Sequence, residues 1–294
     1  MKIRILALAL TAMGLSPLAQ AQSDNPIVAA NNEIGIAATG SLLNYQEHLP
    51  SPSDTESGWR PGFEITASGM NSKIVPHLYL GLSYKYNQGT VTYHGALLTV
   101  PPLPITEGTP SITQQLMVKL GKGFFLNSDF MVTPYVAYRW YHWDRGSGID
   151  EEVYTQNSFG LGVMGQYSPT PSIVLSANVD WLYGIGSNMH KPEAGVAETG
   201  IPGVILYAPP GQNFRIANRA TVAVGLKADY ALNSSWHLFG AISYLHTNFG
   251  ESPTNSAFLV NTSNGRSIPV SEGFLEPGSS TNLFDVGMGI AYSF

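Results

Sequence analysis

The chain has no cysteine, little charge and no excess of basic residues. Among its 294 residues, only 12% are charged, and the formal net charge is −6. A chain without cysteine is compatible with an oxidising compartment, where a stray thiol is a liability. The negative net charge argues against nucleic acid as a partner, because binding to phosphates requires a basic surface.

Long apolar runs are also missing, although 44% of the residues are hydrophobic. A membrane-spanning helix needs about eighteen or more consecutive apolar residues, and no run approaches that length. The sequence also lacks a Gly-x-Ser-x-Gly motif, a phosphate-binding loop and the spacing of a metal-ligand motif. We therefore predict no membrane-spanning helix, no cofactor and no metal site.

The first 21 residues have the three parts of a secretory signal peptide. Lys2 and Arg4 precede an apolar run from Ile5 to Leu15, and Ala19-Gln20-Ala21 follows as a small-residue cleavage site. We predict cleavage after Ala21, which leaves residues 22–294 as the mature chain. The protein is therefore expected to leave the cytoplasm.

The end of the chain alternates between large apolar residues and small or polar ones. The large residues are Phe284, Val286, Met288, Ile290, Tyr292 and Phe294, and those between them are Asp285, Gly287, Gly289, Ala291 and Ser293. Side chains on a strand alternate between its two faces, so the pattern predicts a strand with one apolar face. A terminal Phe on such a strand resembles the last strand of bacterial outer-membrane barrels. The resemblance implies that the barrel assembly machinery reads Phe294, Tyr292 and Ile290.

Similar alternating segments recur along the chain, separated by turn-rich stretches. They lie at about 32–46, 59–70, 78–87, 112–121, 130–141, 158–167, 173–183, 219–230, 236–248 and 284–294. Transmembrane barrels have an even strand number, short periplasmic turns and long outer loops, and closure leaves no unpaired edge in the bilayer. We predict one all-β domain at 22–294, a ten-stranded antiparallel transmembrane β-barrel with short periplasmic turns and long extracellular loops. A soluble sandwich is the alternative.

Aromatic residues on the apolar faces gather near the two ends of the strands. Near the long-loop ends lie Trp59, Tyr84, Tyr86, Tyr138, Trp140, Trp181, Tyr183 and Tyr244, and near the short-turn ends lie Phe130, Tyr167, Tyr230, Trp236, Tyr292 and Phe294. Two aromatic belts are typical of the two membrane–water interfaces. They predict a barrel integral to the outer membrane of a Gram-negative cell, in contact with its lipid.

The opposite faces of the strands carry charges of both signs. We predict that the lumen contains Arg60, Lys85, Lys119, Arg139, Arg219 and Lys227, together with Glu33, Glu64, Asp180, Asp229 and Asp285. Buried charges must be paired, and a barrel this narrow is mostly filled by side chains. The pattern favours a cross-linked polar core, with a narrow, porin-like conduit for a small solute as the alternative.

The strand number, the five long outer loops and the mature length resemble the omptin family of outer-membrane proteases. The stretch Thr113–Gly146, with its aromatic and basic rim Tyr138-Arg139-Trp140-Tyr141, is similar to the fourth and fifth strands of an omptin. The resemblance implies a peptide-cleaving groove at the top of the barrel. There, two Asp residues would face an Asp–His pair that activates a water.

The residues at the corresponding positions depart from the omptin pattern. The second outer loop, at about 87–111, contains only Glu107 as an acid. His190 lies near the expected place after the seventh strand, but Asn188 stands where the acid would be. Asn can orient an imidazole but cannot stabilise its charged form. We therefore interpret the protease residues as not retained.

Other acidic and imidazole groups lie near the outer rim. His142 and Asp144 share a strand face, in principle within reach of His190 or His246. A His–Asp pair there is either a catalytic remnant, a metal site or an interfacial feature. Asp54 and Glu56 lie in the first loop, where we interpret them as solvated.

These observations lead to one preferred function and two alternatives. Loops on rigid scaffolds commonly carry function, and the long loops near 88–111, 185–216 and 249–280 are neutral and rich in Gly and Pro. We predict a non-enzymatic outer-membrane protein whose loops serve adhesion or ligand contact, with the surface ligand unidentified. An active omptin-like endopeptidase and a narrow small-solute channel are the alternatives.

Overall fold

The computed structural model describes residues 25–49, 53–71, 75–148, 151–271 and 273–294. The predicted signal peptide, residues 1–21, and its cleavage site lie outside these ranges. Within them, α-helix is limited to the short α2 (Pro26–Ala29). No helix of this part of the chain is long and apolar enough to cross a membrane.

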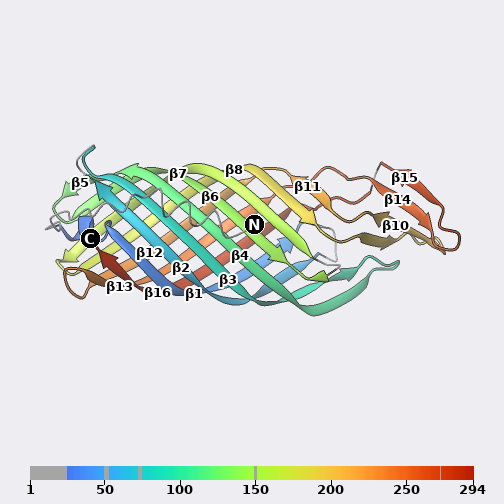
Figure 1. Cartoon of the computed structure of the whole chain (residues 1–294), viewed down its shortest axis with the longest axis horizontal. Coiled ribbons are helices and arrows are strands. Elements are labelled where there is room, and N and C mark those ends of the chain that lie inside the picture. Colours follow the sequence, from blue (N-terminus) through green and yellow to red (C-terminus); the bar gives the residue numbers. More distant parts are fainter. Residues whose placement is uncertain (1–24, 50–52, 72–74, 149–150, 272) are drawn as a thin grey trace.

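Ten long antiparallel strands form a closed barrel (Figure 1). They are β1 (Glu33–Glu47), β2 (Thr55–Asn71), β3 (Leu78–Leu97), β4 (Leu103–Lys122), β6 (Phe130–Arg145), β7 (Glu152–Thr170), β8 (Ile173–Lys191), β12 (Ala220–Ala231), β13 (Trp236–Phe249) and β16 (Ser279–Ser293). Two short strands, β5 (Phe124–Asn127) and β11 (Gln212–Ile216), pair with β6 and β8. The predicted all-β, ten-stranded antiparallel barrel is confirmed.

The last strand pairs with the first and closes the barrel. β16 lies antiparallel to β1, with Ile290 opposite Ile36 and Asp285 opposite Ser41. On its other side, β16 pairs with β13. Each barrel strand therefore has two neighbours, and no unpaired edge of the barrel faces the bilayer.

The two faces of the strands become the two surfaces of the barrel. In β1, Ile34 and Ile36 are exposed on the outside, whereas Glu33 and Ser41 are buried inside. The same alternation leaves exposed aromatic residues at both ends of the wall. These are Trp59, Trp181, Tyr183 and Tyr244 near the long-loop ends, and Tyr167, Tyr230, Trp236 and Tyr292 near the short-turn ends. An apolar outside and a polar inside is the arrangement of a transmembrane barrel.

The second outer connection is mostly strand, which corrects the predicted loop at 88–111. β3 and β4 form one long hairpin, in register from the pair Leu78–Lys122 to the pair Leu97–Leu103. The prolines of β4 lie beyond Ser111, the last residue of this strand that pairs with β6. There β4 is an edge strand, where proline is tolerated because no partner needs its N–H.

The fourth and fifth outer connections also contain strands, which corrects the predicted loops at 185–216 and 249–280. β9 (Gly195–Glu198), β10 (Val204–Ala208), β14 (Ala257–Asn261) and β15 (Ser267–Val270) form a four-stranded sheet in the order β15-β14-β10-β9. We call it the arm sheet. In Figure 1, β10, β14 and β15 extend beyond the barrel at its loop end. Their β-branched and aromatic residues favour strands.

An N-terminal plug, residues 25–32, closes the barrel at the short-turn end. The Asn25 side chain caps α2 by accepting hydrogen bonds from the backbone N–H groups of Ile27 and Val28. Ile27 is fully buried in a cluster with Ala30, Met70, Tyr79, Met131 and Val174. The Phe294 N–H donates to Asn32 O at 3.1 Å. The plug therefore holds the end of the last strand as well as the floor of the lumen.

Candidate functional site

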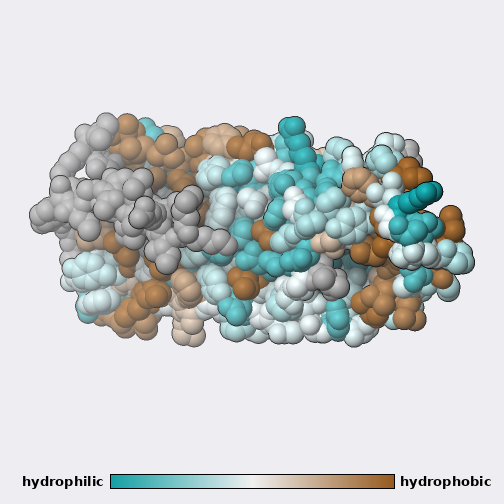
Figure 2. Space-filling model, turned by 45° about the vertical axis from the view of Figure 1, so that its right-hand side comes forward, coloured by the Kyte–Doolittle hydropathy of each residue, from teal (hydrophilic) through white to brown (hydrophobic). Residues whose placement is uncertain are grey.

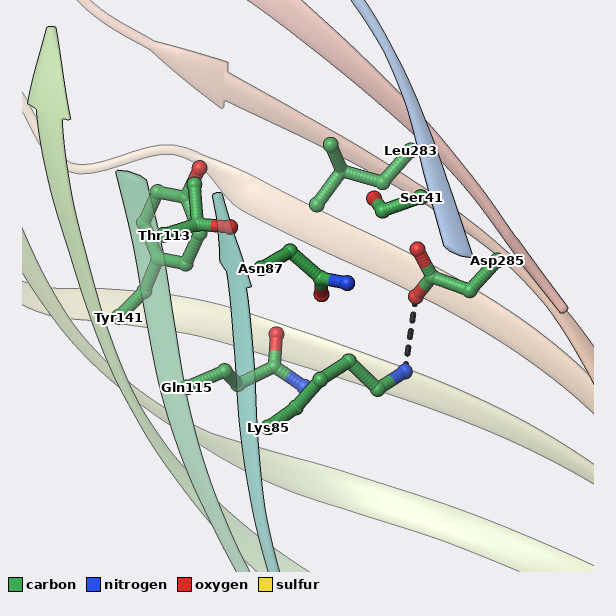
Figure 3. A pocket seen from close by; sticks show the side chains of 8 residues that line it. All are labelled: Ser41, Lys85, Asn87, Thr113, Gln115, Tyr141, Leu283 and Asp285. Carbon is green, nitrogen blue, oxygen red and sulfur yellow. Dashed lines mark hydrogen bonds and ion pairs between the residues drawn. The ribbon is translucent and has the colours of Figure 1, made fainter. Parts of the chain in front are cut away.

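Ion pairs cross the lumen at its middle level. Lys85 Nζ lies 2.8 Å from Asp285 Oδ2, and Lys119 Nζ lies 3.2 Å from Asp180 Oδ1. The Tyr135 hydroxyl donates to Asp180 Oδ1 at 2.6 Å. Figure 3 shows Lys85 reaching from β3 across to Asp285 on β16. Because the pairs join strands that are not neighbours, they cross-link the interior.

The other predicted lumen charges have different surroundings. Arg60 and Arg139 are fully buried, and they donate to the side chains of Ser41, Ser111, Gln115 and Gln156. Glu64 is half-buried on the inward face of β2. Lys227 and Asp229 lie near the N-terminal plug, beside Glu33. Arg219 corrects the prediction, because it precedes the first residue of β12 and is exposed.

In the described part of the chain, side chains fill the lumen at three levels. A cavity of about 10 Å³ beside Lys85 and Asp285 (Figure 3) has room for about one water. Toward the loop end lies an apolar cluster made of Leu43, Tyr45, Val91, Tyr141, Trp143, Tyr154, Met189, Phe214, Ile216, Leu245, Phe249 and Leu283. The N-terminal plug fills the short-turn end. This arrangement favours a cross-linked core over a conduit.

At the mouth of the barrel, one arginine is surrounded by glutamates. Arg145 Nη1 lies 2.6 Å from Glu152 Oε2 and 3.3 Å from Glu47 Oε1. Arg145 Nε lies 2.7 Å from Glu56 Oε1. The Tyr154 hydroxyl contacts Glu276 Oε1 at 2.6 Å and Glu152 Oε2 at 3.0 Å. We call Arg145, Glu47, Glu56, Glu152, Tyr154 and Glu276 the mouth cluster.

The mouth cluster contains more carboxyl groups than cations, and it lies beyond the outer aromatic belt. Burial raises the pKa of Glu47 to about 7 and raises the pKa of Glu276 well above its ordinary value. The Tyr154 hydroxyl has one proton but contacts two carboxyl groups, so a second proton is needed in this row. Burial and the neighbouring Glu152 and Glu47 thus raise the pKa of Glu276 and favour its protonated form.

Sequence reasoning missed the mouth cluster. It placed Asp54 and Glu56 in a solvated first loop, and the structure corrects this. Glu56 lies within β2 and is buried, and Asp54 accepts a hydrogen bond from the Tyr93 hydroxyl at 2.7 Å. A usable signal existed, because Glu47 and Arg145 continue the inward alternation of the first and fifth predicted strands.

His142 and Asp144 form a pair on the outer wall of the barrel. His142 Nε2 lies 2.9 Å from Asp144 Oδ1. Both residues belong to the outward-facing set of β6, whereas Tyr141, Trp143 and Arg145 between and beside them point inward. The imidazole stacks on the Trp140 ring, with a centroid distance of 5.6 Å. The pair therefore faces away from the lumen, above the aromatic belt.

The remaining predicted catalytic positions do not converge on this pair. His190 Nδ1 lies 3.1 Å from Asn213 Oδ1, on the outer side of β8 and β11. His246 Nδ1 lies 2.8 Å from Asn282 Oδ1, on the outer side of β13 and β16. Glu107 is exposed on the part of β4 that extends past β6. These groups surround no common cleft among the described residues.

The three residues predicted as the assembly signal lie on the outside of β16. Ile290, Tyr292 and Phe294 are exposed near the short-turn end of the barrel. The Tyr292 ring packs edge-on against Trp236 of the neighbouring strand, with a centroid distance of 5.3 Å. This surface lies on the outside of the barrel wall.

The arm sheet exposes apolar residues on both faces. Leu206, Leu259 and Ile268 lie in one cross-strand row, and Tyr207 and Phe258 lie in a row of the opposite face. All of them are at least partly exposed, and Ile268 is 65% exposed. Figure 2 shows hydrophobic residues gathered at the loop end, separated from those of the barrel by a more hydrophilic zone.

The two edges of the arm sheet differ. At the β9 edge, the Glu198 N–H donates to Leu98 O at 2.7 Å, and the Val100 N–H donates to Glu198 Oε2 at 3.0 Å. The tip of the β3–β4 hairpin thus supports β9. At the other edge, β15 pairs with β14 alone among the described residues, and it contains Pro269. Proline blunts an edge against further strand pairing, so the faces are the accessible surface of the arm sheet.

Comparison with known proteins identifies the fold. The outer membrane protease OmpT from Escherichia coli is similar, with a TM-score of 0.52, 11% identity, and coverage of 90% of this chain and 97% of that chain. The translocator domain of the autotransporter NalP from Neisseria meningitidis (TM-score 0.35, 11% identity, coverage 89% and 88%) is more distant. So is the Pseudomonas putida toluene transporter TodX (TM-score 0.33, 11% identity, coverage 92% and 93%).

The likeness to OmpT confirms the predicted resemblance to omptins at the level of the fold. At 11% identity it carries no information about activity. No family model matches the chain, and no curated protein matches it in sequence. The chain has the fold of outer-membrane β-barrels, and its function has to be argued from its own residues.

Proposed function

We propose that the chain is an integral outer-membrane protein whose arm sheet contacts a surface ligand through apolar groups. In this proposal, the signal peptide is removed after Ala21 and the aromatic belts contact outer-membrane lipid. The barrel assembly machinery binds the outer face of β16 at Ile290, Tyr292 and Phe294. The barrel itself serves as a rigid, closed support.

The observation that carries the proposal is the two-sided apolar surface of the arm sheet. Exposing apolar surface to water costs about 25 cal/mol per Å², and large exposed apolar patches mark interaction sites. The row of Leu206, Leu259 and Ile268 offers such a patch on one face. The opposite face, with Tyr207 and Phe258, adds aromatic rings, which are common in contact surfaces.

The interior of the barrel supports this assignment over the two alternatives. The conduit alternative requires an open lumen, whereas the apolar cluster and the N-terminal plug occupy both ends. The endopeptidase alternative requires an acid and an imidazole that meet across a groove. His142, His190 and His246 instead make their hydrogen bonds on the outer wall.

A bead-binding assay tests the arm sheet. Cells that display the chain are mixed with octyl-coated fluorescent beads, and bound beads are counted by flow cytometry. We expect binding above the level of cells without the chain. The double substitution Leu259→Ser with Ile268→Ser should lower it to that level, because the two side chains lie opposite each other on one face.

The matched control is Leu126→Ser at the short-turn end. Leu126 is 67% exposed, similar to Ile268, but it lies at the opposite end of the barrel. We expect the control to bind beads as the parent chain does, and heat-modifiable mobility on a gel to verify that all variants are folded. Unchanged binding by the double variant would contradict the proposal.

A peptide-cleavage assay separates the proposal from the endopeptidase alternative. The chain folded in detergent is incubated with a fluorogenic peptide, alongside His190→Ala. We expect no cleavage that depends on His190. Strong cleavage that is lost in His190→Ala would overturn the non-enzymatic assignment. Silence in planar-bilayer recordings is expected on the same grounds, because the lumen is filled.

A further inference from the structure

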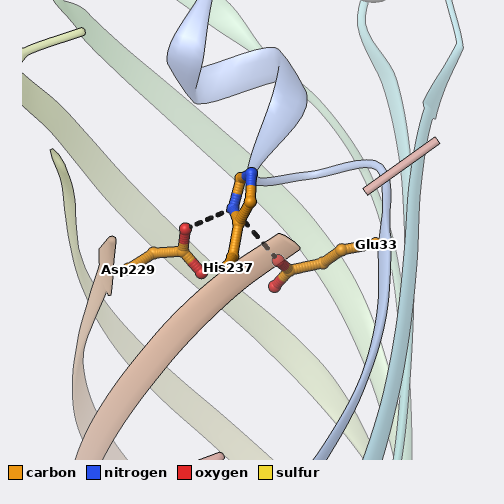
Figure 4. A group of neighbouring side chains, drawn as sticks. All are labelled: Glu33, Asp229 and His237. Atoms are coloured by element: carbon orange, nitrogen blue, oxygen red, sulfur yellow. Dashed lines mark hydrogen bonds and ion pairs between the residues drawn. The ribbon is translucent and has the colours of Figure 1, made fainter. Parts of the chain in front are cut away.

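Three buried side chains with metal-binding atoms meet near the short-turn end. They are Glu33 of β1, Asp229 of β12 and His237 of β13 (Figure 4). One ligand atom from each lies within 4.8 Å of the other two. His237 Nδ1 is 2.6 Å from Asp229 Oδ1 and 3.8 Å from Glu33 Oε2. Asp229 and His237 lie on one hairpin, but Glu33 is far from both in sequence, which is why no metal-ligand spacing is visible there.

Two carboxylate oxygens of this group receive no hydrogen bond, Glu33 Oε2 and Asp229 Oδ2, and the second of them lies 3.2 Å from Lys227 Nζ. Glu33 is 2% exposed, and its Oε2 atom receives no hydrogen bond. A buried carboxylate oxygen without a partner is costly. Figure 4 shows the imidazole of His237 lying between the two carboxylates. The unpartnered oxygen of Glu33 therefore points to a missing positive group in this space.

The site can be reached from the short-turn end. A pocket of about 360 Å³ is lined by Asp229 and His237, by Pro26 and Ala29 of the N-terminal plug, and by the turns at 171–172 and 231–234. An ion entering from that side meets His237 and Asp229 first. The pocket also has room for a water to complete a coordination shell.

In this structure, the positive charge beside Glu33 and Asp229 comes from Lys227. Its Nζ contacts Glu33 Oε1 and lies 3.2 Å from Asp229 Oδ2. The ammonium supplies one positive charge to two carboxylates, so a divalent ion in its place would balance the charge of both. The lysine stem is flexible and its side chain is 29% exposed, so the ammonium can move away when another cation binds.

We propose that Glu33, Asp229 and His237 bind a divalent transition-metal ion, for which Zn²⁺ is the best match. Zinc accepts imidazole nitrogen and carboxylate oxygen at about 2.0–2.2 Å, and three protein ligands with one water form an ordinary four-coordinate site. Binding exchanges the proton between His237 Nδ1 and Asp229 Oδ1 for the metal and displaces the Lys227 ammonium. No covalent or redox step is involved.

Such an ion would join the first strand to a late hairpin. Glu33 lies at the start of β1, and Asp229 and His237 lie on the β12–β13 hairpin, with only β16 between β13 and β1. The metal would therefore bridge across the last strand, next to the seam that closes the barrel. It would therefore stabilise the closed barrel and hold the N-terminal plug in place.

The test measures zinc binding by the full chain folded in detergent micelles after treatment with a chelator. Isothermal titration with ZnCl₂ should give one ion per chain, and Co²⁺ should give the visible absorption of a four-coordinate site. Glu33→Gln and His237→Ala should weaken binding at least tenfold. Lys227→Met should strengthen it about tenfold, because it removes the competing ammonium.

The matched control is His246→Ala on the same strand. Its imidazole lies on the outer wall, away from Glu33 and Asp229, so zinc binding should be unchanged. Binding that is equal in the parent chain and His237→Ala, or that is lost in His246→Ala, would overturn the proposal. So would the absence of binding in both the parent chain and Lys227→Met, or an equal affinity in these two. Heat-modifiable mobility shows that each variant is folded.

Discussion

The two ends of the barrel bury charged groups in opposite ways. At the loop end, Glu47, Glu56, Glu152 and Glu276 gather at Arg145 and Tyr154. At the short-turn end, Glu33 and Asp229 face Lys227 and His237. The mouth cluster therefore has more carboxyl groups than cations, and burial favours the protonated form of Glu47 and Glu276. The short-turn group has nearly balanced charge and can exchange its own cations for another.

At each end of the barrel, buried ionisable groups attach a separate segment to the barrel wall. Glu276 belongs to the long connection that carries β14 and β15, so the mouth cluster ties the base of the arm sheet to the barrel wall. Glu33 follows the N-terminal plug, so the short-turn group ties the plug and the first strand to the β12–β13 hairpin. Substitutions at the two ends should therefore differ in size and in readout.

The largest effect is expected from Arg145→Met. The substitution leaves the buried Glu47 and Glu56 and the half-buried Glu152 without their common cation, and breaking a buried ion pair in this way costs about 3–5 kcal/mol. Urea unfolding of the detergent-folded chain, followed by tryptophan fluorescence, measures the loss. Arg215→Met is the control, because Arg215 is exposed on β11. A loss equal to that of the control would show that the mouth cluster contributes no stability.

A smaller loss is expected from Lys227→Met in the presence of a chelator. The short-turn group retains a second cation, because His237 can take up a proton beside Asp229. We therefore expect a loss of about 1–3 kcal/mol, below that of Arg145→Met. The same unfolding experiment measures it, with Lys122→Met at the end of β4 as the control. A loss larger than that of Arg145→Met would reverse the comparison between the two ends.

The period of the strands explains how much of this structure could be predicted. Alternation placed Lys85, Lys119, Asp180 and Asp285 inside the barrel and Ile290 outside, because a period of two depends only on neighbouring residues. The ends of the strands were harder to predict than their faces. The prolines of the second connection indicated a loop, although an edge strand tolerates them. The extension of β2, β6 and β7 beyond their predicted ends was missed as well, and with it the mouth cluster.

Groups assembled from distant strands could not be predicted from the sequence. Asp229 and His237 share the β12–β13 hairpin, but Glu33 meets them only because β1 and β13 both pair with β16, which no spacing in the sequence reveals. His142 and Asp144 show the converse. Their spacing correctly placed both on one strand face, and the same alternation that turns Tyr141 and Arg145 inward turns this face to the outer wall, away from a lumenal groove.

The stability of the contact between the arm sheet and the barrel should depend on pH, which distinguishes the loop end from the short-turn end. The folded pKa of Glu47 is about 7, above its ordinary value of 4.5, and the pKa of Glu276 is raised in the same direction by burial. The folded chain therefore binds more protons than the unfolded chain between these values. The stability due to the protonated carboxyls is fully present below about pH 4.5 and is lost as the pH rises through 7.

Hydrogen exchange in residues 273–278 measures this effect at the base of the arm. After correction for intrinsic exchange, we expect the open fraction of the segment to rise roughly tenfold between pH 5 and pH 8. Glu276→Gln keeps a neutral side chain at all pH values, so its segment should depend less on pH. Equal pH dependence in the parent chain and Glu276→Gln would show that the proton is held elsewhere.

The smallest effect on the free energy of unfolding is expected for the His142–Asp144 pair, which lies on the outer wall and not in the lumen. His142 and Asp144 form a partly exposed pair at 2.9 Å, and such pairs contribute about 0–1 kcal/mol. His142→Ala should therefore change the free energy of unfolding by less than any substitution above, and Asp144→Asn should do the same. If His142→Ala instead destabilised the chain as much as Lys227→Met, the stacking on Trp140 would have to hold the loop end of β6 in place.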